Sequence, residues 1–192
     1  MAVKRLELKN VFEKVGNDFS SESLHVGILG CGDKRFIRGH KKLLEGLVQK
    51  KIDLTTFDIT VEHLAGEEGV VQHDVTEPLP GGPFDLIIGH VLLKFIPTQK
   101  QWDVVKNAYD ALYQSGLAIF VQGKQELEYS DRVENYKAHD AYQYKPGQLN
   151  PVLINDLKKK LTEAAIEFIN WESSIEGIED VPIVANILVL KK

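Results

Sequence analysis

The chain has 192 residues, which is enough for one domain with a sizeable buried core. Hydrophobic residues make up 43% of the sequence and charged residues 27%, a mixture typical of globular proteins. The formal net charge of -5 argues against a broad phosphate-binding face, so we do not expect bulk nucleic acid as a partner.

The sequence argues against a membrane or secreted protein and against a protein held by disulfides or by a cysteine-rich zinc site. No apolar run approaches the roughly 20 residues that a membrane helix needs, and the first 16 residues lack the apolar core of a secretory signal. Cys31 is the only cysteine, so an intrachain disulfide and a cysteine-rich zinc site are ruled out. We therefore expect a cytoplasmic protein that neither binds a metal nor acts at a membrane.

Apolar strands alternate with helices along the chain, which predicts an α/β fold with a parallel sheet covered on both faces. We expect Val3, Leu6 and Val11 of the first helix and Phe36 of the second helix to face the core. We expect the third helix to end near Gly116. The predicted helices cover residues 3–15, 35–50, 99–113 and 151–165, and the predicted strands cover 25–29, 52–59, 69–73, 84–89, 117–122, 166–171 and 183–190.

The segment 123–150 differs from this pattern because it is polar and rich in tyrosine. We interpret it as a lid or insertion within a single domain that spans residues 1–192. Its tyrosines, with His139 and Asp140, either line a substrate pocket or pack a lid helix, and the sequence does not decide between the two.

Gly30-Cys31-Gly32 follows the first predicted strand, where a ligand can approach the backbone closely. A dinucleotide-binding fingerprint is not matched, because Arg35 stands at the third glycine. A phosphate-binding loop is also incomplete, since Asp33 occupies the place of its lysine. A nucleotide-handling enzyme with an irregular loop over residues 27–34 remains an alternative, and it predicts magnesium-dependent binding of ATP or GTP.

Further polar residues follow the next strands at the same edge of the predicted sheet. Asp58 ends the second strand, Asp74 follows the third, and His90 follows the fourth. The carboxyl ends of parallel strands meet at one edge, which is where ligands bind in such sheets. A carboxylate at the end of the second strand can accept hydrogen bonds from both hydroxyls of a ribose.

Over about residues 24–122 the sequence resembles the class I, Rossmann-like methyltransferases that use S-adenosylmethionine. The matching pieces are ILGCGD, FDI, HDVTEPLP, PFDLIIGHVLLKFI and NAYDALYQSGLAIFV. The resemblance implies a three-layer fold with a seven-stranded, mostly parallel sheet whose last strand is antiparallel. It also implies S-adenosylmethionine as cofactor and methyl transfer to a small-molecule or protein acceptor that the sequence does not identify.

The family's binding roles are carried over by position. The glycine turn approaches the amino acid end of the cofactor, Asp58 holds the ribose, Asp74 meets the adenine, and His90 lies beside the methyl group and the amino acid end. The cofactor-binding residues implied in this way are Gly30, Cys31, Gly32, Asp58, Ile59, Asp74, Val75 and His90. Where a general base is required, the candidates are His90, His139 and Asp140.

The first motif departs from the family at two places. Ile28 stands where the family has an acidic residue, and Lys34 stands where it has a third glycine. Lys34 is expected to crowd the turn and to add a positive charge beside a sulfonium cofactor. The alternative function is therefore a catalytically inactive module with the same fold, which acts as a binding partner or scaffold.

Overall fold

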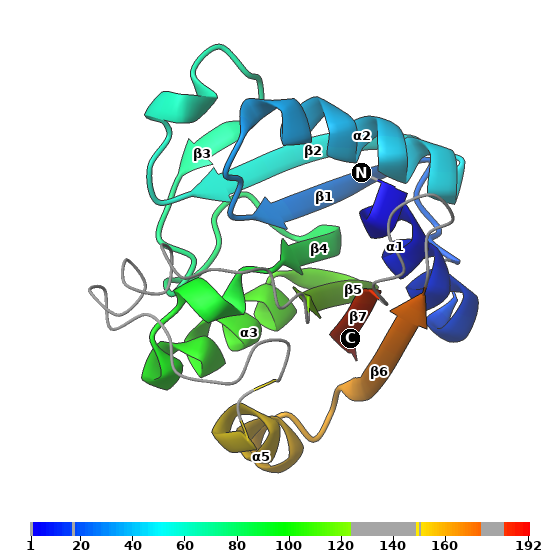
Figure 1. Cartoon of the computed structure of the whole chain (residues 1–192), viewed down its shortest axis with the longest axis vertical. Helices are drawn as coiled ribbons and strands as arrows, with labels where there is room; N and C mark the ends of the chain where they lie inside the picture. Colours follow the sequence, from blue (N-terminus) through cyan, green and yellow to red (C-terminus); the bar gives the residue numbers. More distant parts are fainter. Residues whose placement is uncertain (1, 17, 124–148, 150, 174–182) are drawn as a thin grey trace.

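The computed structural model describes residues 2–16, 18–123, 149, 151–173 and 183–192, and in these residues seven strands form one sheet (Figure 1). The strand order is β3-β2-β1-β4-β5-β7-β6. The strands are β1 (Ser23–Leu29), β2 (Lys51–Asp58), β3 (Val70–Gln72), β4 (Phe84–His90), β5 (Leu112–Gly123), β6 (Ala165–Ser173) and β7 (Ile183–Lys191). Pairs from β3 to β5 are parallel, and β7 is antiparallel to both of its neighbours, so the predicted topology is confirmed.

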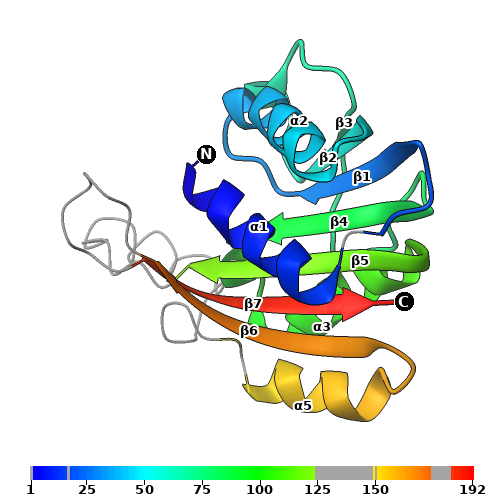
Figure 2. The same ribbon diagram turned by 90° about the vertical axis from the view of Figure 1, so that its right-hand side faces the viewer.

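Helices cover both faces of the sheet and make a three-layer fold (Figures 1 and 2). One face packs against α1 (Ala2–Val15) and α2 (Lys34–Val48), and the other against α3 (Gln101–Asp110) and α5 (Pro151–Lys160). Successive residues of a strand pack against opposite helix layers, because their side chains point to opposite faces of the sheet. Ile28 and Ile88 belong to the first core, whereas Leu29 and Ile87 belong to the second.

The edge of the sheet where β1 and β4 begin is fixed by a buried carboxylate. Asp85 accepts hydrogen bonds from the hydroxyl of Ser21 (3.0 Å) and from the backbone N–H of His25 (2.9 Å). The parallel register then pairs Ile28 with Ile88. Gly30 and His90, each two residues further on, therefore both lie at the opposite edge of the sheet.

The start of α2 is set by its N-cap. Asp33 has an extended backbone, and its side chain accepts a hydrogen bond from the N–H of Arg35 (2.8 Å). The Arg35 guanidinium and this hydrogen bond lower the pKa of Asp33 to about 2. The helix ends with Gln49 in the left-handed region.

The prediction that Gly116 ends the third helix is wrong. α3 ends at Asp110, and β5 begins only two residues later at Leu112. The pairing of β4 with β5 shifts register between Phe84 and Leu86, so Gly116 lies inside the strand at an irregularity. A Cβ atom at this position would lie only 3.0 Å from the carbonyl oxygen of Phe84. The close approach of the β4 backbone therefore explains why the residue is a glycine.

Three smaller predictions also differ from the structure. Leu6 and Phe36 are 37% and 38% exposed, so neither faces the core, and Leu8 takes the inward place on α1. Phe36 instead lies beneath the ammonium group of Lys4, 4.8 Å from ring centroid to Nζ. The helix predicted over residues 151–165 ends at Lys160, after which the chain turns into β6.

The predicted lid over residues 123–150 lies almost wholly outside the described residues, and His139 and Asp140 lie there too. None of the helices in the described part of the chain is both long and apolar enough to cross a membrane.

Candidate functional site

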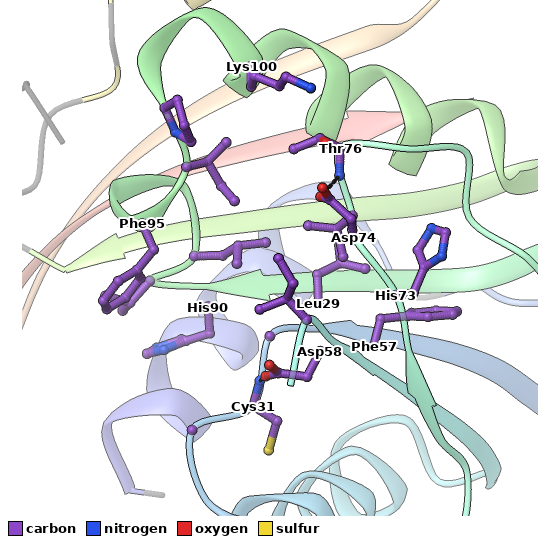
Figure 3. A pocket seen from close by; sticks show the side chains of 18 residues that line it. Leu29, Cys31, Phe57, Asp58, His73, Asp74, Thr76, His90, Phe95 and Lys100 are labelled. Atoms are coloured by element: carbon purple, nitrogen blue, oxygen red, sulfur yellow. Dashed lines mark hydrogen bonds between the residues drawn. The ribbon is translucent and has the colours of Figure 1, made fainter. Parts of the chain in front are cut away.

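A cavity of about 550 Å³ opens at the edge of the sheet where β1, β2, β3 and β4 end (Figure 3). Its walls combine the glycine turn after β1, the segments after β2 and β3, and the chain from β4 to the two 3₁₀ turns Leu93–Phe95 and Thr98–Lys100. The residues that line it are Leu29, Gly30, Cys31, Gly32, Phe57, Asp58, Ile59, His73, Asp74, Val75, Thr76, His90, Val91, Leu92, Phe95, Ile96, Pro97 and Lys100.

The turn after β1 brings backbone, not side chains, to the cavity wall. Gly30 has a φ of +74°, and its N–H donates to the carbonyl of Phe57 (2.8 Å). A Cβ atom there would lie 3.0 Å from the side chain of Leu92, while a Cβ atom on Gly32 would meet nothing within 4 Å. The first position therefore requires glycine for its backbone conformation, and the second leaves open space for a ligand.

Lys34 does not crowd this turn, contrary to the expectation from the sequence. It is the exposed first residue of α2 and is not among the residues that line the cavity. The N-cap formed by Asp33 begins the helix at this point, so the lysine side chain belongs to the helix surface.

Asp58 joins the end of β2 to the glycine turn. Its Oδ2 accepts a hydrogen bond from the N–H of Cys31 (2.7 Å), and its Oδ1 accepts one from the N–H of Thr60 (3.1 Å). Figure 3 shows this carboxylate beside Cys31 at the cavity. An ionised carboxylate has about four acceptor positions, so two remain for hydroxyl groups of a ligand.

The end of the cavity near β3 combines apolar and acidic surface. Ile59 is 64% exposed, which is unusual for an isoleucine, and Val75 is buried. Asp74 accepts a hydrogen bond from the N–H of Thr76 (2.9 Å), and this bond lowers the pKa of the carboxyl group. Asp74 is therefore an ionised acceptor at neutral pH, beside surfaces suited to a flat apolar ring.

Cys31 takes part through its backbone. Its side chain is 4% exposed, and the thiol lies 3.3 Å from the carbonyl oxygen of Asp33. Burial raises the pKa of the Cys31 thiol, so it remains protonated at neutral pH. The thiol therefore fills space beneath the turn.

His90 is held by a residue of the first helix. Its Nε2 lies 2.9 Å from Oε2 of Glu7, and the two side chains are 19% and 3% exposed. Burial lowers the pKa of His90 against the opposite effect of Glu7, so the imidazole is neutral at neutral pH. Val91, directly after it, has a φ of +60°, which β-branched residues rarely adopt.

The structure brings all eight of the predicted cofactor-binding positions to this one cavity. Of the candidates for a general base, only His90 lies among the described residues. In the part of the chain that the structure describes, no group of three or more metal-binding side chains is placed to hold a metal ion.

Sequence reasoning missed Glu7 and the wall that the chain forms from Leu92 to Lys100. A signal for Glu7 was present. Glu7 shares a helical stripe with Leu8 and Val11, which are buried in the core, so a charged residue falls on an otherwise apolar face.

Comparison with known proteins identifies the fold. No family model matches the sequence, and no curated protein sequence is significantly similar to it. Among solved structures, the plantazolicin methyltransferase BpumL, in complex with a triazolic desmethylPZN analog and S-adenosylhomocysteine, matches with a TM-score of 0.68 and 13% identity, covering 97% of this chain and 84% of that one.

Two further structures match over most of both chains. N-methyltransferase NodS from Bradyrhizobium japonicum WM9 has a TM-score of 0.54 and 15% identity, covering 97% of this chain and 95% of its own. Magnesium protoporphyrin IX methyltransferase (ChlM) from Synechocystis PCC 6803, with bound S-adenosylhomocysteine, has a TM-score of 0.56 and 16% identity, covering 98% and 83%. The chain therefore has the fold of the class I S-adenosylmethionine-dependent methyltransferases.

Proposed function

We propose that this protein binds S-adenosylmethionine in the cavity beside the glycine turn and transfers its methyl group to a small-molecule or protein acceptor. The observation that carries the proposal is the position of Asp58. Its carboxylate lies at the cavity, is fixed by the N–H groups of Cys31 and Thr60, and keeps two acceptor positions for a ribose.

The other walls of the cavity fit the remaining parts of this cofactor. Ile59 and Val75 offer apolar surface for an adenine ring, and Asp74 is an acceptor for the amino group of the ring. Gly30 and Gly32 leave the backbone open to an amino acid end. The solved methyltransferases BpumL and ChlM, which share the fold, contain S-adenosylhomocysteine, and this supports the same ligand here.

When bound, S-adenosylmethionine supplies a methyl group that its sulfonium centre has already activated. The protein then has to align the two reactants and to exclude water. Leu29, Leu92 and Ile96 line the cavity with apolar surface and serve the second purpose.

A catalytically inactive module of the same fold, which acts as a binding partner or scaffold, is the second candidate. It is favoured by Ile28, whose side chain is 2% exposed in the core, so the first motif carries no carboxylate at this position. Lys34, the other departure from the family, is exposed and is not among the residues that line the cavity.

Isothermal titration with S-adenosylmethionine and S-adenosylhomocysteine tests the binding step. We expect saturable binding of both without magnesium, whereas ATP with magnesium is the control for the phosphate-loop alternative. No binding at millimolar ligand would exclude the proposal. Labelled methyl from S-adenosylmethionine is then followed into low-mass and protein fractions of a cell extract. Binding without any transfer would favour the inactive module.

A further inference from the structure

A buried carboxylate stands behind the wall of the cavity. Glu7, in α1, has a side chain that is only 3% exposed, and its Oε2 lies 2.9 Å from Nε2 of His90 at the end of β4. His90 itself lines the cavity, and in Figure 3 its imidazole reaches toward the α1 ribbon. β1 and β4 are neighbouring parallel strands, and Gly30 and His90, which follow or end them, both line the cavity.

The charged neighbours of this carboxylate among the described residues are His90 and Lys4, which lies one turn earlier on α1 and interacts electrostatically with Glu7. The ammonium group of Lys4 lies 3.0 Å from Nε2 of His40 and 4.8 Å from the ring of Phe36. Among the described residues, Glu7 forms an ion pair within 4 Å with His90 alone. A buried carboxylate is costly unless charges and hydrogen bonds compensate it, and here Lys4 and the hydrogen bond to His90 do so, which holds the His90 ring in one orientation.

The hydrogen bond between the two side chains also fixes where the imidazole proton lies. With Oε2 of Glu7 as the acceptor of this hydrogen bond, Nε2 of His90 carries the proton and Nδ1 keeps a free lone pair. Nδ1 has no hydrogen-bond partner among the described residues. Burial keeps His90 neutral at neutral pH, so the Nδ1 lone pair is available as an acceptor.

We propose that Glu7 is a positioning residue, which holds His90 with Nδ1 as the acceptor for the ammonium group at the amino acid end of the cofactor. The inference rests on the proposed function. The carboxylate that Ile28 does not provide in the first motif comes here from α1 and acts through His90. A carboxylate acting through an imidazole stabilises a cation beside Gly30 while Glu7 itself stays buried.

The assignment changes the role of His90. An Nδ1 lone pair that accepts a hydrogen bond from the cofactor is not available to take a proton from the methyl acceptor. His90 is then a binding residue, and any base for the acceptor comes from another group or from water.

The native protein allows a first test by nitrogen-15 NMR of the histidine side chains. We expect the His90 pattern to be that of a ring protonated at Nε2. S-adenosylhomocysteine should shift the Nδ1 resonance, while 5′-methylthioadenosine, which lacks the amino acid end, should leave it in place. A ring protonated at Nδ1, or equal shifts with both ligands, would overturn the assignment.

Calorimetry on two matched variants gives the second test. Glu7→Gln removes the buried charge, and Glu13→Gln removes a carboxylate of the same helix that is 61% exposed. Glu7→Gln should weaken S-adenosylhomocysteine about ten- to a hundredfold and change 5′-methylthioadenosine less than twofold, while Glu13→Gln should change neither.

The affinity for 5′-methylthioadenosine shows in the same experiment whether the variant cavity is intact. Equal weakening of both ligands, or no weakening, would overturn the role of Glu7 and leave the proposed function standing. Failure of the native protein to bind either ligand would overturn both. If Glu7→Gln does not fold, the NMR comparison on the native protein decides the question.

Discussion

Replacement of Asp58 is the sharpest perturbation of the proposed cofactor site. Its carboxylate has two acceptor positions left after the N–H groups of Cys31 and Thr60 are satisfied. Two ribose hydroxyls would fill them, and each hydrogen bond to a charged acceptor contributes roughly 1.5–3 kcal/mol when water is excluded. The two bonds together contribute roughly 3–6 kcal/mol, so at ~1.4 kcal/mol per decade Asp58→Ala should weaken S-adenosylhomocysteine by about a hundredfold to ten-thousandfold.

The same carboxylate also supports the fold, so Asp58→Ala has a second effect. Cys31 is buried, and its N–H loses its acceptor in this variant, at a cost of roughly 1–3 kcal/mol in the free energy of unfolding. Asp58→Asn keeps an acceptor oxygen and should lose less stability while still binding the cofactor more weakly. Calorimetry and urea unfolding of the two variants separate the contributions.

The control has to be a carboxylate away from the cavity. Asp53 lies on the same strand and is exposed, so Asp53→Asn should change neither affinity nor stability by much. Asp85 is unsuitable despite lying at the far edge of the sheet, because it is buried and accepts two hydrogen bonds. Equal affinities of native protein and Asp58→Ala would refute the placement of the ribose.

Three further predictions concern stability, close approach and pH. Gly69→Ala should lower the free energy of unfolding in urea by about 3 kcal/mol or more, because φ is +70° and the new Cβ would lie 2.2 Å from the carbonyl oxygen of Leu54. Gly66→Ala, where φ is also positive but space is open, should lower it by only about 1–2 kcal/mol. Equal losses in the two variants would contradict the clash. Gly32→Ala should change stability by less than about 0.5 kcal/mol but weaken S-adenosylhomocysteine in calorimetry, and unchanged affinity would place the ligand elsewhere. Burial lowers the pKa of His40 from 6.5 to about 3. Between these pH values the unfolded chain binds the proton and the folded protein does not, so the free energy of unfolding decreases as the pH falls from about 6.5 to about 3, by up to about 1.4 kcal/mol per pH unit. His40→Gln should flatten this slope in urea unfolding between pH 7.5 and 5, and an unchanged slope would refute it.

The sheet and the position of the cavity follow from features that are local in the sequence. Apolar runs such as residues 25–29 and 84–89 indicate strands by periodicity, and parallel strands place their carboxyl ends at one edge. Gly30, Asp58 and His90 could therefore be brought together without any knowledge of side-chain contacts.

Other features depend on contacts between distant segments. Glu7 and His90 are 83 residues apart, and only the packing of α1 against the sheet brings them together. The irregularity of β5 near Gly116 likewise arises from its pairing with β4. A glycine after a helical pattern is compatible with both a helix end and a strand irregularity, and tertiary pairing decides between them.

The central claim is tested most directly by a crystal structure of the protein with S-adenosylhomocysteine. The account predicts ligand density in the cavity, with the ribose hydroxyls on Asp58, the adenine near Asp74, and the amino group within hydrogen-bond distance of Nδ1 of His90. Density elsewhere on the protein, or an empty cavity at millimolar ligand, would contradict it.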